Sequence, residues 1–301
     1  MRIVFMGSPE IAVPALQALA KAYDVAGVVT QPDRAAGRGK KVAMPAVKSA
    51  ALELGIPVIQ PEKMKDSLDQ LQEWDPEMIV VFAFGKILRP SVLDLPKYGC
   101  LNIHPSLIPR WRGASPIQAA ILHGDSRTGV TIMKMDAGMD TGPTLAVREF
   151  PMDPEETAET LSAKAAEIGA ELLLQTIPGY IAGTILPQPQ NEEGVTYTGM
   201  FEKQDGLMDF EQSADSLVWK VRAFTPWPSA FFMLGEDAIK VLKAHTVPNP
   251  EGLLPGTRFK SGKFPAVAAA DGCLVLDEVQ APGKKAMPGS AFLAGCRNWS
   301  N

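Results

Sequence analysis

Apolar and polar segments alternate along the first half of the chain as expected for strands and helices that follow one another. Residues 78–84 contain no polar side chain, which is typical of a central parallel strand with helices on both faces. Shorter apolar runs predict further strands at residues 1–7, 25–30, 57–60, 101–104 and 129–135. Apolar residues at helical spacing predict helices at 9–22, 45–54, 64–74 and 115–123. This order predicts an α/β fold with a doubly wound, mostly parallel, Rossmann-like sheet.

A longer helix is predicted to begin at Asp153, which has the features of an N-cap. Pro154 would take the first helical position, and Glu156 lies three residues after the cap. Apolar residues share one helical face at positions 161, 165, 168 and 172. The Pro-Gly pair at 178–179 predicts the end of this helix.

The second half of the chain has a different pattern. The polar, proline-broken residues 187–194 are typical of an interdomain linker. From Gly206 the pattern predicts one helix and then short strands at residues 238–244, 256–261, 266–270 and 273–279. Such strands predict a small all-β domain, for which an OB-like barrel is expected. We therefore expect a first domain at residues 1–190, a linker at 191–205 and a second domain at 206–301.

The composition is that of an ordinary globular protein. The chain has 301 residues, enough for two domains, and 46% of them are hydrophobic and 21% charged. No stretch approaches the apolar length of a membrane span, and residues 1–7 have the pattern of a first strand rather than of a signal peptide. Cys100, Cys273 and Cys296 are widely spaced and form no metal-binding pair. We expect a cytoplasmic monomer that binds no membrane and no metal.

The charge of the chain is unevenly distributed. A net charge of −5 argues by itself against nucleic-acid binding, because affinity for phosphates comes from lysine and arginine. Residues 205–301 hold ten basic and ten acidic side chains, so the acidic excess lies upstream. Within that acidic part, residues 31–48 carry a single acidic residue, Asp33, and five basic residues, Arg34, Arg38, Lys40, Lys41 and Lys48. A solvated surface loop or a contact with nucleic acid would both explain this segment.

Asn102 and His104 lie at the end of a predicted strand and, because side chains alternate along a strand, on the same face. Asp140 lies in a glycine-rich loop after the next predicted strand, at the same edge of the sheet. An amide, an imidazole and a carboxylate suit the stabilisation of a tetrahedral oxyanion during acyl transfer to an amine. The alternative is that these side chains only satisfy backbone groups at the strand end.

Two long motifs resemble the family of folate-dependent formyltransferases. They are residues 102–116, which contain Asn102 and His104, and residues 129–142, which contain Asp140. The resemblance implies that these three residues are catalytic. In the mechanism expected from their chemistry, Asn102 and His104 donate hydrogen bonds to the oxyanion, while Asp140 fixes the histidine and helps to move a proton from the amine towards the leaving nitrogen. It also implies that the folate contacts are Ser106, Leu107, Ile108 and Pro109. The chain departs from the family at Met200 and Phe210, where Lys and Trp are common.

Further segments resemble the members of that family that act on initiator tRNA. They are residues 31–41, 222–228 and 280–287. The resemblance implies transfer of the formyl group of 10-formyltetrahydrofolate to the amino group of initiator methionyl-tRNA, without a metal. It implies that tRNA contacts Arg34, Arg38, Lys40 and Lys41 in the first domain, as well as the OB-like second domain. Trp227, between two prolines, is expected to be buried, the alternative being a ring that stacks on a base.

Two rival functions remain open from the sequence. One is a formyltransferase that acts on a small amine, such as an amino sugar nucleotide or a glycinamide ribonucleotide. The second domain and the basic segment argue against it. The other is an RNA-binding module without catalysis, against which the intact Asn102, His104 and Asp140 argue.

Overall fold

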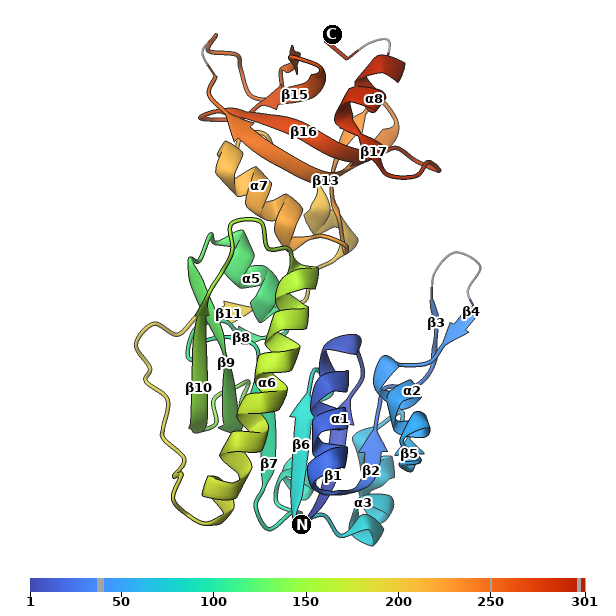
Figure 1. Ribbon diagram of the computed structural model, residues 1–301, viewed down its shortest axis with the longest axis vertical. Helices are drawn as coiled ribbons and strands as arrows, with labels where there is room; N and C mark the ends of the chain where they lie inside the picture. The colour runs from blue at the N-terminus through green and yellow to red at the C-terminus, as the bar shows by residue number, and fades with distance from the viewer. Residues whose placement is uncertain (37–40, 250, 297–298, 301) are drawn as a thin grey trace. The chain divides into compact units, whose positions relative to one another are not determined.

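The structure is a computed structural model that describes residues 1–36, 41–249, 251–296 and 299–300 (Figure 1). The chain forms two compact units. The first unit comprises Met1–Pro116, Arg127–Pro151 and Ser162–Thr198. The second comprises Ile117–Ser126, Met152–Leu161 and Gly199–Asn301.

A seven-stranded sheet, in the order β10-β9-β7-β6-β1-β2-β5, forms the centre of the first unit. Its strands are β1 (Arg2–Gly7), β2 (Asp24–Val29), β5 (Val58–Ile59), β6 (Met78–Phe82), β7 (Cys100–His104), β9 (Arg127–Lys134) and β10 (Thr144–Pro151). The pairs from β5 to β7 are parallel, whereas β9 and β10 are antiparallel to their neighbours. The predicted Rossmann-like, mostly parallel fold is therefore confirmed.

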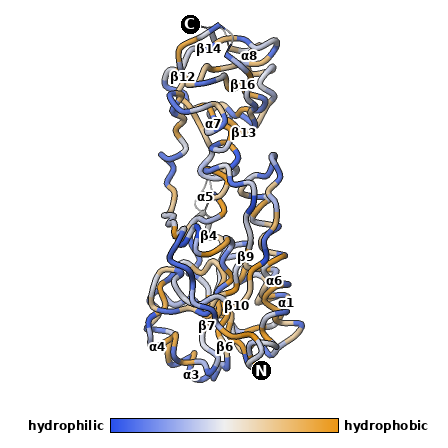
Figure 2. Tube along the Cα trace, turned by 90° about the vertical axis from the view of Figure 1, so that its left-hand side faces the viewer, coloured by the Kyte–Doolittle hydropathy of each residue, from blue (hydrophilic) through white to orange (hydrophobic). Residues whose placement is uncertain are grey.

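Helices cover both faces of this sheet. The helical segments of this unit are η1 (Glu10–Ala12), α1 (Val13–Ala22), α2 (Ala46–Glu53), η2 (Met64–Ser67), α3 (Leu68–Trp74), α4 (Pro90–Leu93) and most of α6 (Ala158–Ile181), whereas α5 (Pro116–Leu122) belongs to the second unit except for Pro116. Gly169 of α6 lies against Phe82 and Ile103 on one face, where Figure 1 shows α1 and α6 in front of the strands. Ile79 and Val81 pack on the other face in a core with residues of η2, α3 and α4. All five residues of β6 are buried in this way, and Figure 2 colours this region as hydrophobic.

The long helix α6 corrects two predictions. It begins at Ala158, not Asp153, because the carboxylate of Asp153 accepts a hydrogen bond from Glu155 N in a separate turn. Thr157 is placed as the cap, since its hydroxyl accepts from Thr160 N and Thr160 Oγ1 accepts from Thr157 N. The helix also continues through Pro178 to Ile181. Pro178 is tolerated one turn before the end, where its carbonyl accepts from Ala182 N at 3.0 Å.

The second unit is built on an antiparallel sheet in the order β12-β13-β16-β15-β14, with β17 paired to β16. Its strands are β12 (Ala230–Leu234), β13 (Asp237–Val247), β14 (Arg258–Ser261), β15 (Phe264–Ala268), β16 (Cys273–Gln280) and β17 (Met287–Pro288). Its helical segments are η3 (Lys203–Gly206), α7 (Ala214–Ala223) and α8 (Gly289–Gly295). Leu217 and Val221 of α7 pack on the sheet with Trp299. The predicted small β domain is confirmed. Within the described residues, no helix is long and apolar enough to span a membrane.

Trp227 is exposed, which is contrary to the prediction that it is buried. Its side chain is 58% exposed in the turn between α7 and β12. Phe224 and Trp299 fill the interior instead, and the indole nitrogen of Trp299 donates to Phe259 O at 2.6 Å. The two prolines beside Trp227 therefore present the ring to solvent, rather than turning it into the core.

Candidate active site

Asn102 and His104 lie on β7, between β6 and β9, and all residues of this strand are buried. Asn102 is 8% exposed. Among the described residues, none makes a hydrogen bond to its side-chain amide. The amide is therefore a donor whose hydrogen bonds remain available to a bound molecule.

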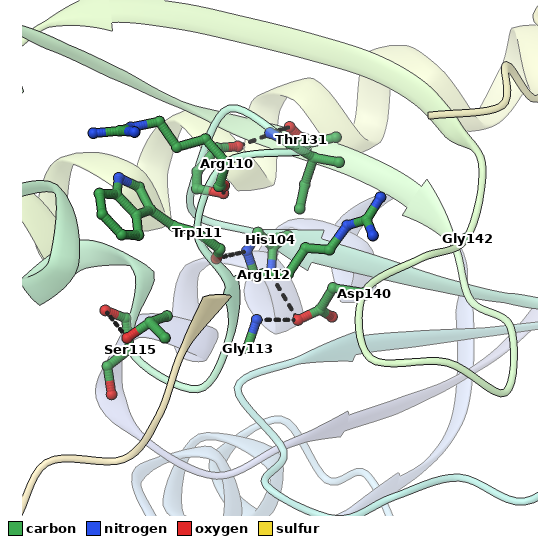
Figure 3. A network of polar contacts seen from close by, with 12 residues as sticks. His104, Arg110, Trp111, Arg112, Gly113, Ser115, Thr131, Asp140 and Gly142 are labelled. Carbon is green, nitrogen blue, oxygen red and sulfur yellow. Dashed lines mark hydrogen bonds and ion pairs between the residues drawn. The ribbon is translucent and has the colours of Figure 1, made fainter. Parts of the chain in front are cut away.

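His104 is held from two sides (Figure 3). Its Nε2 lies 3.0 Å from the carbonyl oxygen of Trp111, which can only accept, so Nε2 carries a proton and donates it. Its Nδ1 lies 3.7 Å from the Oδ2 atom of Asp140. When the ring is neutral, its lone pair is therefore on Nδ1, the nitrogen that faces the carboxylate.

The pKa of His104 is lowered from its ordinary value of 6.5. Burial is the largest cause, because it disfavours the charged ring. The carboxylate of Asp140 and the hydrogen bond to Trp111 act in the opposite direction. We therefore assign a neutral imidazole to the folded protein near pH 7, with a carboxylate placed to stabilise a proton that arrives on Nδ1.

Asp140 lies in the loop between β9 and β10 and has a left-handed backbone, with φ of 53°. Its Oδ2 accepts a hydrogen bond from Gly113 N at 2.7 Å. Asp136 ties the loop together, since its Oδ1 accepts from Gly138 N at 3.0 Å and from the Thr141 hydroxyl at 2.7 Å. A Cβ at Gly142 would meet Lys134 O, so this position requires glycine. The sequence-predicted Asp140 and His104 are thus brought together from separate segments.

The predicted folate stretch, residues 106–109, directly follows β7. Ser106 is fully buried, and its hydroxyl donates to Arg110 O at 2.7 Å. The hydroxyl of Thr131 on β9 donates to Ser106 O at 2.7 Å. Leu107, Ile108 and Pro109 are partly exposed. These bonds tie the stretch to the sheet beside His104, while Leu107, Ile108 and Pro109 stay partly exposed.

Two residues at this site, Arg112 and Gln190, were not singled out as functional from the sequence. Arg112 is 1% exposed, and its Nε and Nη2 donate to Gln190 Oε1 at 3.0 and 2.6 Å. Gln190 Nε2 in turn donates to Asp140 O at 2.8 Å and Gly142 O at 2.7 Å. Arg112 lies inside a recognised motif, but no periodic pattern in the sequence connects it to a glutamine 78 positions away.

The basic segment contains a hairpin of β3 (Arg34–Ala36) and β4 (Lys41–Ala43). Arg34 is exposed, and Lys41 begins β4. Arg38 and Lys40 lie outside the described residues. Lys48 Nζ is bonded to both carboxylate oxygens of Asp33, at 2.9 and 2.7 Å. These bonds lower the pKa of Asp33, and they occupy the positive charge of Lys48.

The amino-acid sequence matches two family descriptions. The description "Formyl transferase" matches residues 1–177, and "Formyl transferase, C-terminal domain" matches residues 200–297. A relative from Myxococcus xanthus named methionyl-tRNA formyltransferase is 46% identical over 297 residues, which cover 98% of this chain and 95% of the relative. One from Citrifermentans bemidjiense with the same name is 42% identical over 299 residues, or 98% and 93% of the two chains.

Solved structures show the same fold at lower sequence identity. WlaRD, described as a sugar 3N-formyl transferase in the presence of dTDP and 5-N-formyl-THF, has a TM-score of 0.69 and 19% identity, over 95% of this chain and 99% of that chain. A methionyl-tRNA formyltransferase from Clostridium thermocellum has a TM-score of 0.59 and 18% identity, over 81% and 93% of the two chains. At these identities the likeness shows the fold alone.

Proposed function

We infer that this chain, which belongs to the formyl transferase family, is an enzyme that transfers a formyl group to the methionine of methionyl-tRNA. The observation that carries this function is the similarity, at 41–46% identity over nearly the full chain, to proteins named methionyl-tRNA formyltransferase. The formyl donor is 10-formyltetrahydrofolate, and the acceptor is initiator methionyl-tRNA. The alternative, a small amine as acceptor, is not favoured by these relatives.

In the proposed mechanism, the free amine of methionine attacks the formyl carbon. A C–N bond forms to this amine, the bond from the formyl carbon to N10 of the folate breaks, and one proton passes from the amine to N10. The Asn102 amide donates to the oxygen on which negative charge develops. This role is supported by the amide of Asn102, to which none of the described residues forms a hydrogen bond.

We propose that His104 moves the proton, directly or through a water molecule. This replaces the expectation that His104 donates to the oxyanion, because the N–H of the neutral ring is already donated to Trp111 O. Because Nε2 donates to Trp111 O, the nitrogen that takes up the proton is Nδ1. Asp140, 3.7 Å from Nδ1, stabilises the resulting imidazolium until the proton passes to N10. No step of this scheme requires a metal.

The remaining contacts belong to the same proposal. The folate contacts residues 106–109, in which the buried Ser106 shapes the stretch and Leu107, Ile108 and Pro109 face the ligand. The tRNA contacts Arg34, Arg38, Lys40 and Lys41 and the second domain. We propose domains at residues 1–190 and 206–301, joined by residues 191–205, of which 191–198 pack on the first unit, and we propose that the enzyme acts as a cytoplasmic monomer.

A direct assay tests the reaction. The purified protein is incubated with 10-formyltetrahydrofolate labelled in the formyl group, and with either methionyl-tRNA or a small amine. We expect label on methionyl-tRNA, and far slower labelling of an amino sugar nucleotide or glycinamide ribonucleotide. Faster labelling of a small amine would establish the alternative acceptor.

Substitution of Asn102 tests the proposed oxyanion donor. We expect Asn102→Ala to reduce kcat by on the order of 100-fold or more, since it removes a donor to the developing charge, while folate binding changes little. Asn249→Ala is the control, because among the described residues the Asn249 side chain bonds only to Leu253 in its own loop. A kcat above half of the wild-type value for Asn102→Ala would remove this residue from the mechanism.

A further inference from the structure

Residues 190–198, here called the strap, form hydrogen bonds along residues 109–114. β11 (Tyr197–Thr198) pairs in parallel with β8 (Arg112–Gly113). Thr196 O accepts from Arg112 N at 2.9 Å, and Thr198 O accepts from Ala114 N at 3.1 Å. The Thr196 hydroxyl accepts from Trp111 N at 2.8 Å. The strap lies within the expected linker and the end of the expected first domain, yet in the first unit it is a bonded element.

The residues that the strap holds are the ones that orient the proposed catalytic groups. Trp111 O accepts from Nε2 of His104, and Gly113 N donates to Oδ2 of Asp140 (Figure 3). Trp111 and Gly113 have left-handed backbones, with φ of 63° and 110°. A Cβ at Gly113 would meet Thr198 O, so the approach of the strap requires glycine there. Thr196 and Thr198 of the strap thus fix the peptide groups of residues 111–114, which include Trp111 O beside His104 and Gly113 N beside Asp140.

Gln190 holds the backbone of Asp140, whereas Gly113 N holds its carboxylate. Its Nε2 donates to Asp140 O and Gly142 O, at 2.8 and 2.7 Å. Its Oε1 accepts two hydrogen bonds from the buried guanidinium of Arg112. The same guanidinium reaches the Tyr197 hydroxyl at 3.4 Å and Glu192 at 3.9 Å. All polar atoms of the Gln190 side chain are therefore used to connect the strap, Arg112 and the Asp140 loop.

We propose that the strap is a positioning element for the catalytic loop, and that Gln190 is its main positioning residue. The proposal rests on the proposed function, because it assumes that His104 and Asp140 move the proton. Both polar atoms of the Gln190 side chain bond to this chain, so its proposed action is through Asp140. Its effect is to keep Asp140 at the distance and angle from His104 Nδ1 at which the carboxylate stabilises a proton. A displacement of a catalytic group by about 1 Å costs roughly 100-fold in rate.

The substitution Gln190→Glu separates the two functions of this side chain, which accepts hydrogen bonds from Arg112 and donates them to the Asp140 loop. The carboxylate can still accept from Arg112, but it cannot donate to Asp140 O and Gly142 O. We expect kcat to fall by roughly 10- to 100-fold, with the KM values for methionyl-tRNA and for 10-formyltetrahydrofolate within about twofold of wild type. Hydrogen exchange followed by mass spectrometry should show faster exchange in residues 136–142.

Gln188→Glu is the matched control, two positions earlier in the chain. Gln188 is exposed, and within the part of the chain that the structure describes its side-chain amide bonds only to Leu186 O, at 3.2 Å. We expect neither kcat nor exchange at residues 136–142 to change. Thr196→Val is a second variant, of nearly the same size as the wild type, which removes the acceptor of Trp111 N. It should also lower kcat without a change in KM, although Gln190 is intact.

The outcomes distinguish this proposal from the proposed function. Wild-type protein that does not formylate methionyl-tRNA overturns the function, whereas the exchange measurement still tests the strap. An active wild type together with Gln190→Glu at more than half of its kcat, or with unchanged exchange at residues 136–142, overturns the positioning role. A lower melting temperature with unchanged kcat in both variants would make the strap a purely structural element.

Discussion

His104 is buried as a neutral ring, and this links the stability of the folded protein to pH. Burial lowers its pKa below 6.5, although Asp140 and the bond to Trp111 act in the opposite direction. As the pH falls below 6.5, the unfolded chain binds a proton that the folded chain binds only at its lower pKa. The contribution of the neutral ring is therefore complete above pH 6.5 and is lost as the pH falls towards the folded pKa.

We expect His104→Asn, which cannot titrate at this position, to lose less stability than the wild type on acidification. Urea unfolding at about pH 7.5 and about pH 5.5 gives the free energy of unfolding of both proteins. His123 and His245 are present in both, so their effects cancel. Equal losses in the two proteins would mean that the protonation of His104 is not coupled to folding.

The sequence predicts the residues of the site where they follow a regular pattern. Alternation along β7 predicts Asn102 and His104 on one face, and the shared sheet edge brings Asp140 close to His104. The contacts of Gln190 could not be predicted in this way, because an irregular segment has no periodicity that fixes the direction of its side chains. The prediction that Trp227 is buried at a corner of the domain is wrong, because the sequence does not show that Phe224 and Trp299 already fill the core.

At the scale of elements, the start of α6 gives a direct test of which residue caps the helix. Thr157 and Thr160 exchange hydrogen bonds at the first turn, whereas Asp153 caps only a separate turn. Removal of an N-cap side chain typically costs about 1 kcal/mol. We expect Thr157→Ala to lower the free energy of unfolding by about this amount, and Asp153→Ala to lower it by less. Chemical denaturation of the two variants measures both; a larger cost for Asp153→Ala would place the functional cap at Asp153.

Two of the strands that the sequence missed, β10 and β17, have few buried residues or few residues in all. β10 lies at the edge of the sheet and has one buried residue, Phe150, so its apolar pattern is weak. β17 has two residues, which is too short for a period to be visible. By contrast β6, buried on both faces, was predicted from an uninterrupted apolar run. Hydrophobic patterning therefore predicts the central elements of both units better than their edges.

At the scale of the whole molecule, a net charge of −5 has to be reconciled with a tRNA substrate. Acidic protein surfaces repel phosphates, so affinity has to come from local groups whose positive charge is not already used. The basic segment offers fewer of these than its composition suggests, because Lys48 is bonded to Asp33 and Gln60. Arg34 is exposed, and among the described residues it has no ion pair.

This difference predicts how the affinity for tRNA depends on salt. Each phosphate contact contributes about 0.7 to 0.9 to the slope of log affinity against log salt concentration. If Arg34 contacts a phosphate, Arg34→Ala should reduce the magnitude of this slope by about that amount and weaken binding most at low salt.

The matched control neutralises Lys48 and Asp33 together, as Lys48→Met with Asp33→Asn, which keeps the net charge and should leave the slope unchanged. Fluorescence titration of methionyl-tRNA at several salt concentrations measures all three proteins. An unchanged slope and affinity for Arg34→Ala would make Arg34 a solvated surface residue, and an equal loss of slope in the control would show that tRNA binding depends on Lys48.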